Sequence, residues 1–378
     1  MSENVIRVLN ITRVFQAAGI ESFIMNMYRN IDKNEIQFDF LVMNEKFDCY
    51  ADEISSYGGR RYNIDIKIKN TFLRILIECF ALYKFLKNNE YKIVHMHYTT
   101  PLHALYLYAA KMAGVPVRIY HSHSAEVSGK SSFKLYIYKL CRKKITKWAT
   151  NYFACSKAAA KWMFESEIIE SGQSQVICNG IDTEKFEFNI EKRKYLRKEF
   201  NIEDDYVLIH TGRFTEQKNQ KFIIEIFKTL KSKCNNVKLI LVGTGKLVDE
   251  VIELIEKYQL VSDVFLLGVR DDVEDLLSMA DCYIMPSLYE GLPVAAVEAQ
   301  CSGLPCILSK NITSEIKLIN EVQFFSLSDD TDIWCDGILS YKNATRKEQK
   351  DIIKEKGYSI QEGAKNLLSF YQKVQSSI

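Results

Sequence analysis

Short runs of β-branched and apolar residues alternate with longer segments of helical periodicity along the chain. In the first half this pattern predicts strands at residues 5–11, 38–42, 61–64, 93–96, 117–120 and 151–154. It predicts helices between them, from about residue 21 and at 48–57, 71–88 and 102–113. Strands that alternate with helices indicate a parallel sheet covered by helices on both faces.

The same pattern restarts after residues 179–182. The second series has strands at 206–211, 237–242, 264–267, 282–285 and 306–308, and helices at 219–234, 248–258, 273–279 and 294–302. The sequence therefore predicts an α/β fold of two doubly wound, Rossmann-like domains, 1–182 and 183–357, which face each other across a cleft. Ligands of such sheets bind beyond the carboxyl ends of the strands, so chemistry is expected in the loops that follow them.

Length and charge narrow the class of protein. A chain of 378 residues with a net charge of +2 is not basic enough for a dedicated nucleic-acid binder, although residues 1–185 carry +7 and the remainder −5. We find no secretory signal and no run of about 18 apolar residues. Ten scattered cysteines without a CxxC pair fit a reducing compartment. We therefore expect a cytoplasmic protein.

Two glycine-containing loops follow strands of the second series. In the first, Gly212 allows a close backbone approach, and Arg213 and Lys218 offer positive charge to phosphate oxygens. The other reading of this loop is a solvated turn with two surface cations. In the second, Gly243 and Gly245 form a lone GxG, which by itself favours a tight turn.

Two acids eight residues apart give the most specific signal. Glu290 lies in the loop after a strand, and Glu298 is expected about two turns into the next helix. A carboxylate in the loop can reach a sugar hydroxyl, and one in the helix can accept two ribose hydroxyls. A structural role at the helix N-terminus would explain one acid. It would not explain a second acid within an apolar helix.

Histidines cluster in the first half, where five of the six lie between His95 and His123. Residues i and i+2 of a strand share a face, so His95 with His97 and His121 with His123 could each supply two zinc ligands. Only Glu126 adds an acid nearby. A polar cleft lining, with one histidine acting on substrate, is the favoured interpretation.

The segment 130–148 is basic and aromatic-rich, with seven Lys and Arg residues and no acid. Such a helix can bind an anionic membrane surface. An ordinary amphipathic helix with a solvated basic face is the alternative interpretation.

Taken together, these segments resemble family 4 of the retaining glycosyltransferases, which have the two-domain GT-B fold, and in particular bacterial enzymes of exopolysaccharide and capsule synthesis. The resemblance covers nearly the whole chain. It is carried by residues 18–21, 121–123, 178–182, 212–219 and 243–245, and above all by the E-x7-E signature from Glu290 to Glu298.

The resemblance implies a role for each matching residue. Arg213 and Lys218 would hold the donor diphosphate beside Gly212, Gly243 and Gly245. Glu298 would bind the nucleotide ribose. Glu290 would face the donor sugar, and Gly291 and Leu292 would offer backbone N–H groups. Gly19 would lie in a loop over donor and acceptor, although the usual first glycine is Ala18 here. One histidine would act at the sugar, His121 being slightly favoured over His123.

The resemblance also implies substrates and partners. The donor would be a nucleotide-diphosphate sugar, with uridine as the family's usual base, and the acceptor a glycan or a polyprenyl-diphosphate-linked glycan. Neither a metal nor a cofactor is implied. The enzyme would be cytoplasmic, with peripheral binding to the inner face of the plasma membrane. The terminal helix, 358–378, would pack back on the first domain.

Three alternatives stay open at this point. A nucleotide-sugar epimerase of similar fold would change the free nucleotide sugar without an acceptor. A zinc hydrolase would use the paired histidines. An inactive membrane scaffold is disfavoured because Glu290, Glu298, Arg213 and Lys218 are all present.

Overall fold

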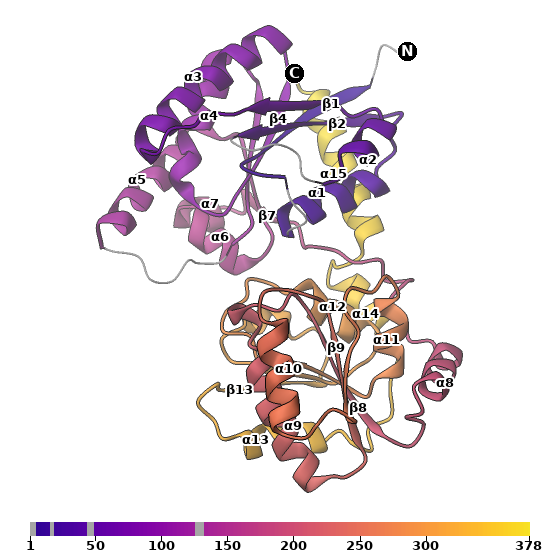
Figure 1. Cartoon of the computed structure of the whole chain (residues 1–378). Coiled ribbons are helices and arrows are strands. Elements are labelled where there is room, and N and C mark those ends of the chain that lie inside the picture. Colours follow the sequence, from indigo (N-terminus) through magenta and orange to yellow (C-terminus); the bar gives the residue numbers. More distant parts are fainter. Residues whose placement is uncertain (1–4, 16–18, 44–48, 125–131) are drawn as a thin grey trace. The chain divides into compact units, whose positions relative to one another are not determined.

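A computed structural model describes residues 5–15, 19–43, 49–124 and 132–378. The chain divides into two compact units, Met1–Gly180 with Ile360–Ile378, and Ile181–Ser359. Each unit contains one parallel sheet with its own hydrophobic core (Figure 1). The expected α/β fold with two Rossmann-like sheets is confirmed.

The first unit contains a seven-stranded sheet in the order β3-β2-β1-β4-β5-β6-β7. Its strands are β1 (Ile6–Thr12), β2 (Ile36–Met43), β3 (Arg61–Ile64), β4 (Ile93–Tyr98), β5 (Val117–Ser122), β6 (Asn151–Ala154) and β7 (Ser174–Val176). Its helices are α1 (Gly19–Asn30), α2 (Ala51–Ser56), α3 (Thr71–Asn89), the 3-10 turn η1 (Pro101–His103), α4 (Ala104–Ala113), α5 (Ser132–Trp148), α6 (Lys157–Met163), α7 (Ser166–Glu170) and α15 (Ile360–Gln375).

Helices cover both faces of this sheet (Figure 1). One core layer lies under α3, α4 and α5, and the other under α1, α2 and α15. The terminal helix α15 packs on α1 and β1 through Ile360, Ala364, Leu367 and Tyr371, which are buried at helical spacing. This packing brings the last residues of the chain onto its first strand.

The second unit contains a six-stranded sheet in the order β10-β9-β8-β11-β12-β13. Its strands are β8 (Tyr206–Thr211), β9 (Val237–Val242), β10 (Val264–Leu266), β11 (Cys282–Met285), β12 (Cys306–Ser309) and β13 (Val322–Phe325). Its helices are α8 (Ile190–Glu199), the 3-10 turn η2 (Glu216–Lys218), α9 (Gln220–Lys233), α10 (Val248–Lys257), α11 (Val273–Met279), α12 (Val294–Cys301), the 3-10 turn η3 (Ser314–Ile316), α13 (Thr331–Leu339) and α14 (Lys350–Glu355).

Both sheets reverse their strand order at one place, between β1 and β4 in the first unit and between β8 and β11 in the second. At such a switch point the loops after the two central strands separate to opposite faces and leave room for a ligand. The edge strands β7 and β13 and the helices α6, α7, α8, α13 and α14 were not predicted from the sequence. Most of them are short, and short elements carry little periodicity.

Candidate functional site

The switch point of the second sheet brings together two loops that are about 70 residues apart in sequence. The Asn219 side-chain amide donates to the Pro286 carbonyl at 3.2 Å, and the Leu288 N–H donates to the Gln217 carbonyl at 2.8 Å. The Gln217 side chain adds a bond to the Tyr289 carbonyl at 3.0 Å. These bonds fix the loop after β8 against the loop after β11.

The joined loops place Lys218 beside Glu290. The Lys218 Nζ lies 2.7 Å from the Glu290 Oε1, as an ion pair rather than a well-aligned hydrogen bond. Both groups are largely buried, with 18% and 9% of the two side chains exposed. The stem of Lys218 passes over Gly212, where a Cβ would lie 3.3 Å from the lysine Cε. Arg213, which follows Gly212 in the sequence, is exposed. An anion that reaches this place would meet a lysine that Glu290 otherwise neutralises.

Gly243 and Gly245 are explained by backbone contacts. Gly243 has a φ of +130°, and a Cβ there would lie 2.1 Å from the Gly212 carbonyl oxygen. A Cβ on Gly245 would lie 2.2 Å from the Phe214 carbonyl oxygen. Phe214 and Gly245 form a parallel bridge, and the Phe214 N–H donates to the Thr244 carbonyl at 2.9 Å. The tight-turn interpretation therefore accounts for both glycines, whether or not a donor binds them.

α12 begins at Val294, where a helix was predicted, so Glu298 lies about one turn into it, and the predicted two turns were wrong. Within the described residues its carboxyl group has no hydrogen-bond or ion-pair partner. Burial raises the pKa of Glu298 to about 7, an effect that the nearby Lys185 partly offsets. Gly291 and Leu292 lie in the loop before the helix, and a Cβ on Gly291 would meet nothing within 4 Å. The open space above Gly291 would let a ligand approach the backbone.

The switch point of the first sheet holds four histidines. His95 and His97 are in β4, His121 is in the neighbouring β5, and His123 follows β5. The His95 Nε2 lies 3.1 Å from the His121 Nδ1, and the His97 Nδ1 lies 2.9 Å from the His123 Nε2. Burial lowers the pKa of every one of these rings, that of His123 to about 3. All four are therefore uncharged at neutral pH.

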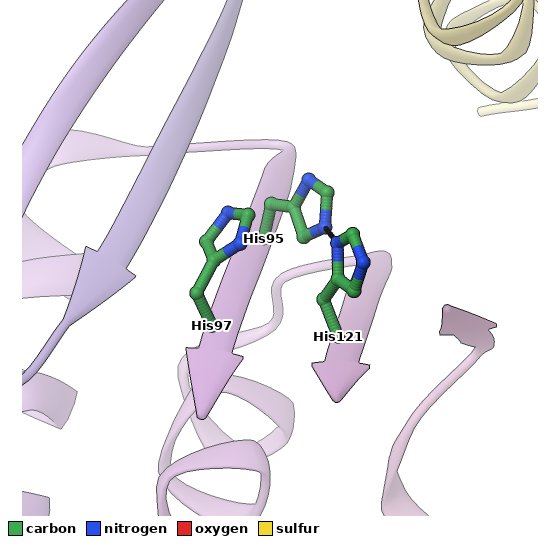
Figure 2. Close-up of side chains that lie close together, drawn as sticks. All are labelled: His95, His97 and His121. Carbon is green, nitrogen blue, oxygen red and sulfur yellow. Dashed lines mark hydrogen bonds between the residues drawn. The ribbon is translucent and has the colours of Figure 1, made fainter. Parts of the chain in front are cut away.

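Figure 2 shows that His95, His97 and His121 gather from the two strands into one group. One ring nitrogen from each lies within 4.8 Å of the others, so these residues could hold a metal ion by distance. The described residues add no carboxylate to this group. Five of the six ring nitrogens in this group already make hydrogen bonds, and only the His121 Nε2 has no partner among the described residues. The hydrogen bonds already made fit a polar cluster better than a metal centre.

Gly19 opens α1 instead of lying in the loop before it. A Cβ at this position would meet nothing within 4 Å, so packing does not demand a glycine here. Its neighbour Ala18, which departs from the usual glycine pair, lies outside the described residues. Glu21, in the same turn, is buried, and burial raises its carboxyl pKa to about 7.

The sequence did not identify two partners of the histidine group. Asn10, in β1, has its Oδ1 3.1 Å from the His97 Nε2, and Tyr371, in α15, has its Oη 2.7 Å from the His95 Nδ1. A polar residue within the buried strand β1 was a possible signal for Asn10. Tyr371 offered none, because it lies 276 residues from His95 and occupies the apolar face of a helix.

Comparison with known proteins relates both units to sugar transferases. The family model for Glycosyltransferase Family 4 matches residues 17–185, and the model for glycosyl transferases group 1 matches residues 191–356. The chain is 34% identical to "Putative glycosyltransferase EpsF" of Bacillus subtilis (strain 168), over 97% of this chain and 96% of that protein. It is 28% identical to the UDP-Gal:alpha-D-GlcNAc-diphosphoundecaprenol alpha-1,3-galactosyltransferase of Escherichia coli, over 80% and 81% of the two chains.

Among solved structures, the chain resembles Anabaena Alr3699/HepE in complex with UDP. The TM-score is 0.76 at 17% identity, and the match covers 99% of this chain and 100% of that one. At this level of identity the likeness concerns the fold.

Proposed function

Because the chain belongs to the glycosyltransferases of family 4 and group 1, we propose that it transfers a sugar from a UDP-linked donor to a glycan or polyprenyl-diphosphate-linked acceptor, with retention and without a metal ion. The observation that carries this proposal is the pairing of Lys218 with Glu290 at the switch point of the second sheet. The relatives named above, one of them a UDP-galactose enzyme with a lipid-linked acceptor, support the choice of donor and acceptor.

In this proposal the donor diphosphate binds Lys218 and Arg213, and its ribose binds Glu298. Breaking the bond from the anomeric carbon to the diphosphate oxygen leaves the electron pair on that oxygen. Preorganised cations and the N–H groups of Gly291 and Leu292 stabilise the developing negative charge. The acceptor oxygen attacks from the face that the diphosphate leaves, and its proton passes to the departing phosphate oxygen. No metal is required in this scheme, because protein groups supply the positive charge.

The direct test is transfer from a panel of UDP-sugars to an undecaprenyl-diphosphate-linked sugar, with the anomeric configuration of the product read by NMR. We expect one donor to be used with retention. Conversion of a free UDP-sugar without an acceptor would instead indicate an epimerase. Stoichiometric zinc in the purified protein, together with loss of activity on chelation, would contradict metal independence and support a hydrolase.

The raised pKa of Glu298 predicts that donor binding releases protons. Hydrogen bonds from two ribose hydroxyls favour the carboxylate and lower its pKa. We expect UDP to bind more tightly as the pH rises from 6 to 8, with release of a fraction of a proton per UDP near pH 7. Calorimetry in two buffers of different ionisation enthalpy measures this fraction.

Glu298→Gln should abolish this proton release, whereas Glu250→Gln, at an exposed acid of α10, should preserve it. Release that persists in Glu298→Gln would assign the proton to another group.

The stability of the unliganded protein is expected to change with pH in the opposite direction from UDP binding. A carboxyl whose pKa rises on folding from 4.5 to about 7 contributes less to the free energy of unfolding as the pH increases over that interval.

We also propose that the first unit binds an anionic membrane through α3, α4 and α5. Five large apolar side chains of α3 are exposed along one face, although the opposite face packs in the core. Further exposed apolar residues lie on α5 and α4, and these three helices pack side by side (Figure 1). These residues are Phe72, Leu73, Leu76, Ile77, Phe80, Tyr108, Met112, Phe133, Leu135, Tyr136 and Leu140.

The charges beside this apolar surface favour an anionic lipid surface over a neutral partner. The described part of α5 contains six Lys and Arg residues and no acid. Lysines flanking exposed aromatic residues are typical of peripheral membrane binding. In the described residues no helix is both long and apolar enough to cross a bilayer. Attachment to the surface would bring the enzyme to a lipid-linked acceptor on the cytoplasmic face.

Removing two of these lysines should weaken binding to anionic vesicles. Each exposed lysine near an anionic surface contributes about 1 kcal/mol, so Lys139→Gln with Lys143→Gln should reduce partitioning roughly 30-fold. The measurement is sedimentation with phosphatidylglycerol vesicles at low salt. The matched control is Lys257→Gln with Lys356→Gln on the second unit. Equal loss in both double variants would argue against a specific surface.

A further inference from the structure

The buried hydroxyl group of Tyr371 determines where its histidine neighbour carries a proton. The Tyr371 Oη lies 2.7 Å from the His95 Nδ1, and it has no other hydrogen-bond partner within the described residues. A buried phenol donates its O–H whenever an acceptor is within reach, because an unpaired buried donor is costly. The His95 Nδ1 must then be the bare, accepting nitrogen. Its ring proton is on Nε2.

The proton on His95 fixes the next ring in turn. The His95 Nε2–H donates to the His121 Nδ1 at 3.1 Å, which leaves the His121 proton on Nε2. That nitrogen is buried and has no partner in the described chain. The reverse arrangement would leave two buried groups unpaired, the tyrosine hydroxyl proton and the His121 Nε2 lone pair, whereas this arrangement leaves only the His121 Nε2–H. The His121 ring therefore presents an unpaired N–H.

In the second pair of histidines the hydrogen bonds point the other way, from His123 through His97 to Asn10. The Asn10 amide nitrogen faces the Val8 carbonyl at 3.5 Å, so its oxygen faces the His97 Nε2 at 3.1 Å and must accept from it. The His97 Nδ1 then accepts from the His123 Nε2–H at 2.9 Å. The His123 Nδ1 is left bare, buried and without a partner in the described residues. His123 therefore presents an acceptor.

We propose that Tyr371 is a positioning residue that acts through His95, so that His121 presents a donor N–H, and His123 an acceptor nitrogen, to a sugar hydroxyl group at the carboxyl ends of β4 and β5. The proposal rests on the sugar-transferase function given above. A sugar hydroxyl both donates and accepts, and the two stacked rings, 4.1 Å apart between centroids, offer one group of each kind. The proposal gives His121 and His123 different chemical roles, whereas the sequence left both as candidates for the same role.

The test begins with the ligand-free protein. Long-range ¹H–¹⁵N correlation on protein with ¹⁵N-labelled histidine distinguishes protonated from bare ring nitrogens. The chain has six histidines, and single His→Gln variants assign them. We expect protonated Nε2 and bare Nδ1 on His95, His97, His121 and His123. A wild-type His121 with its proton on Nδ1, or with a bound metal, would overturn the proposal without any variant.

Tyr371→Phe keeps the aromatic ring and removes the hydroxyl group. We expect the His95 and His121 signals to move toward the other tautomer, while His97 and His123 stay unchanged. The matched control is Tyr28→Phe in the same core layer, whose Oη bonds Gln37 and which contacts none of the four histidines through its hydroxyl group. Unchanged tautomers in Tyr371→Phe would refute the positioning role.

Kinetics then separate this proposal from the proposed function. Tyr371→Phe should lower kcat roughly tenfold with the donor KM within about twofold, since only the orientation of one hydrogen-bond donor is lost. Tyr28→Phe should match the wild type. A tautomer shift with unchanged kcat would disprove the catalytic consequence. Expected tautomers in a protein that transfers no sugar would refute the function and leave the hydrogen-bond chain intact.

Discussion

Replacing Lys218 with alanine is expected to lower kcat by about 10²–10³-fold, or about 3 kcal/mol or more of transition-state stabilisation. Its ammonium group is held at the switch point of the second sheet, where 18% of the side chain is exposed. A cation in this setting is weakly screened and already oriented, so it stabilises a leaving diphosphate strongly. Steady-state transfer kinetics measure the effect, and wild-type turnover would reject the role.

A structural role for Lys218 must be separated from this catalytic one. The variant leaves the Glu290 carboxylate largely buried and without its cation, which destabilises the native state. Lys218→Ala combined with Glu290→Gln removes that unpaired charge. We expect the double variant to recover Tm but not kcat. Lys221→Ala, at a partly exposed lysine of α9 that pairs with Glu250, is the control and should retain full activity.

Replacing Gly243 with alanine is expected to reduce the free energy of unfolding by about 3 kcal/mol or more. The added methyl group would overlap the Gly212 carbonyl oxygen, and a φ of +130° is strained for any residue with a Cβ. Backbone atoms in two hydrogen-bonded loops cannot easily move aside. Urea denaturation measures the loss.

Gly291→Ala is the matched control because its Cβ would meet open space. It should change the free energy of unfolding by no more than about 0.5 kcal/mol. If Gly291 approaches the donor phosphate, as proposed, the same variant should weaken UDP binding instead. Equal stability losses at Gly243 and Gly291 would show that the close contact at Gly212 is not the cause.

The sequence predicted the alternation of strands and helices closely. Each interior strand is a short apolar run, and in each long helix the apolar residues recur about every 3.6 residues, so both signals are local in the sequence. The ends of β4, β5, β8 and β11 lie where the candidate residues were sought. The E-x7-E spacing also identified Glu290 and Glu298 from the sequence alone. The distance of Glu298 from the start of α12 needed correction, and the roles of both acids stay predictions.

The partners of these residues were decided by tertiary structure. Lys218 meets Glu290 because β8 and β11 are neighbours in the sheet. The apolar pattern of a strand predicts the strand itself but not which strand lies next to it. The requirement for Gly243 comes from a carbonyl group about 30 residues earlier. The exposed apolar face of α3 has the composition of a buried one, and only packing distinguishes the two.

The four histidines show most clearly what the sequence predicts and what only the tertiary structure decides. The sequence determined that four imidazoles end two strands and share faces, because side chains of a strand alternate with a period of two. It favoured His121 only slightly over His123 as the residue that acts at the sugar. The structure gives them different hydrogen-bond chains, ending at Tyr371 and Asn10. The Tyr371 contact depends on where α15 packs against the first sheet, and the Asn10 contact depends on the pairing of β1 with β4. Long-range burial of apolar surface decides both, so no local sequence pattern predicts them.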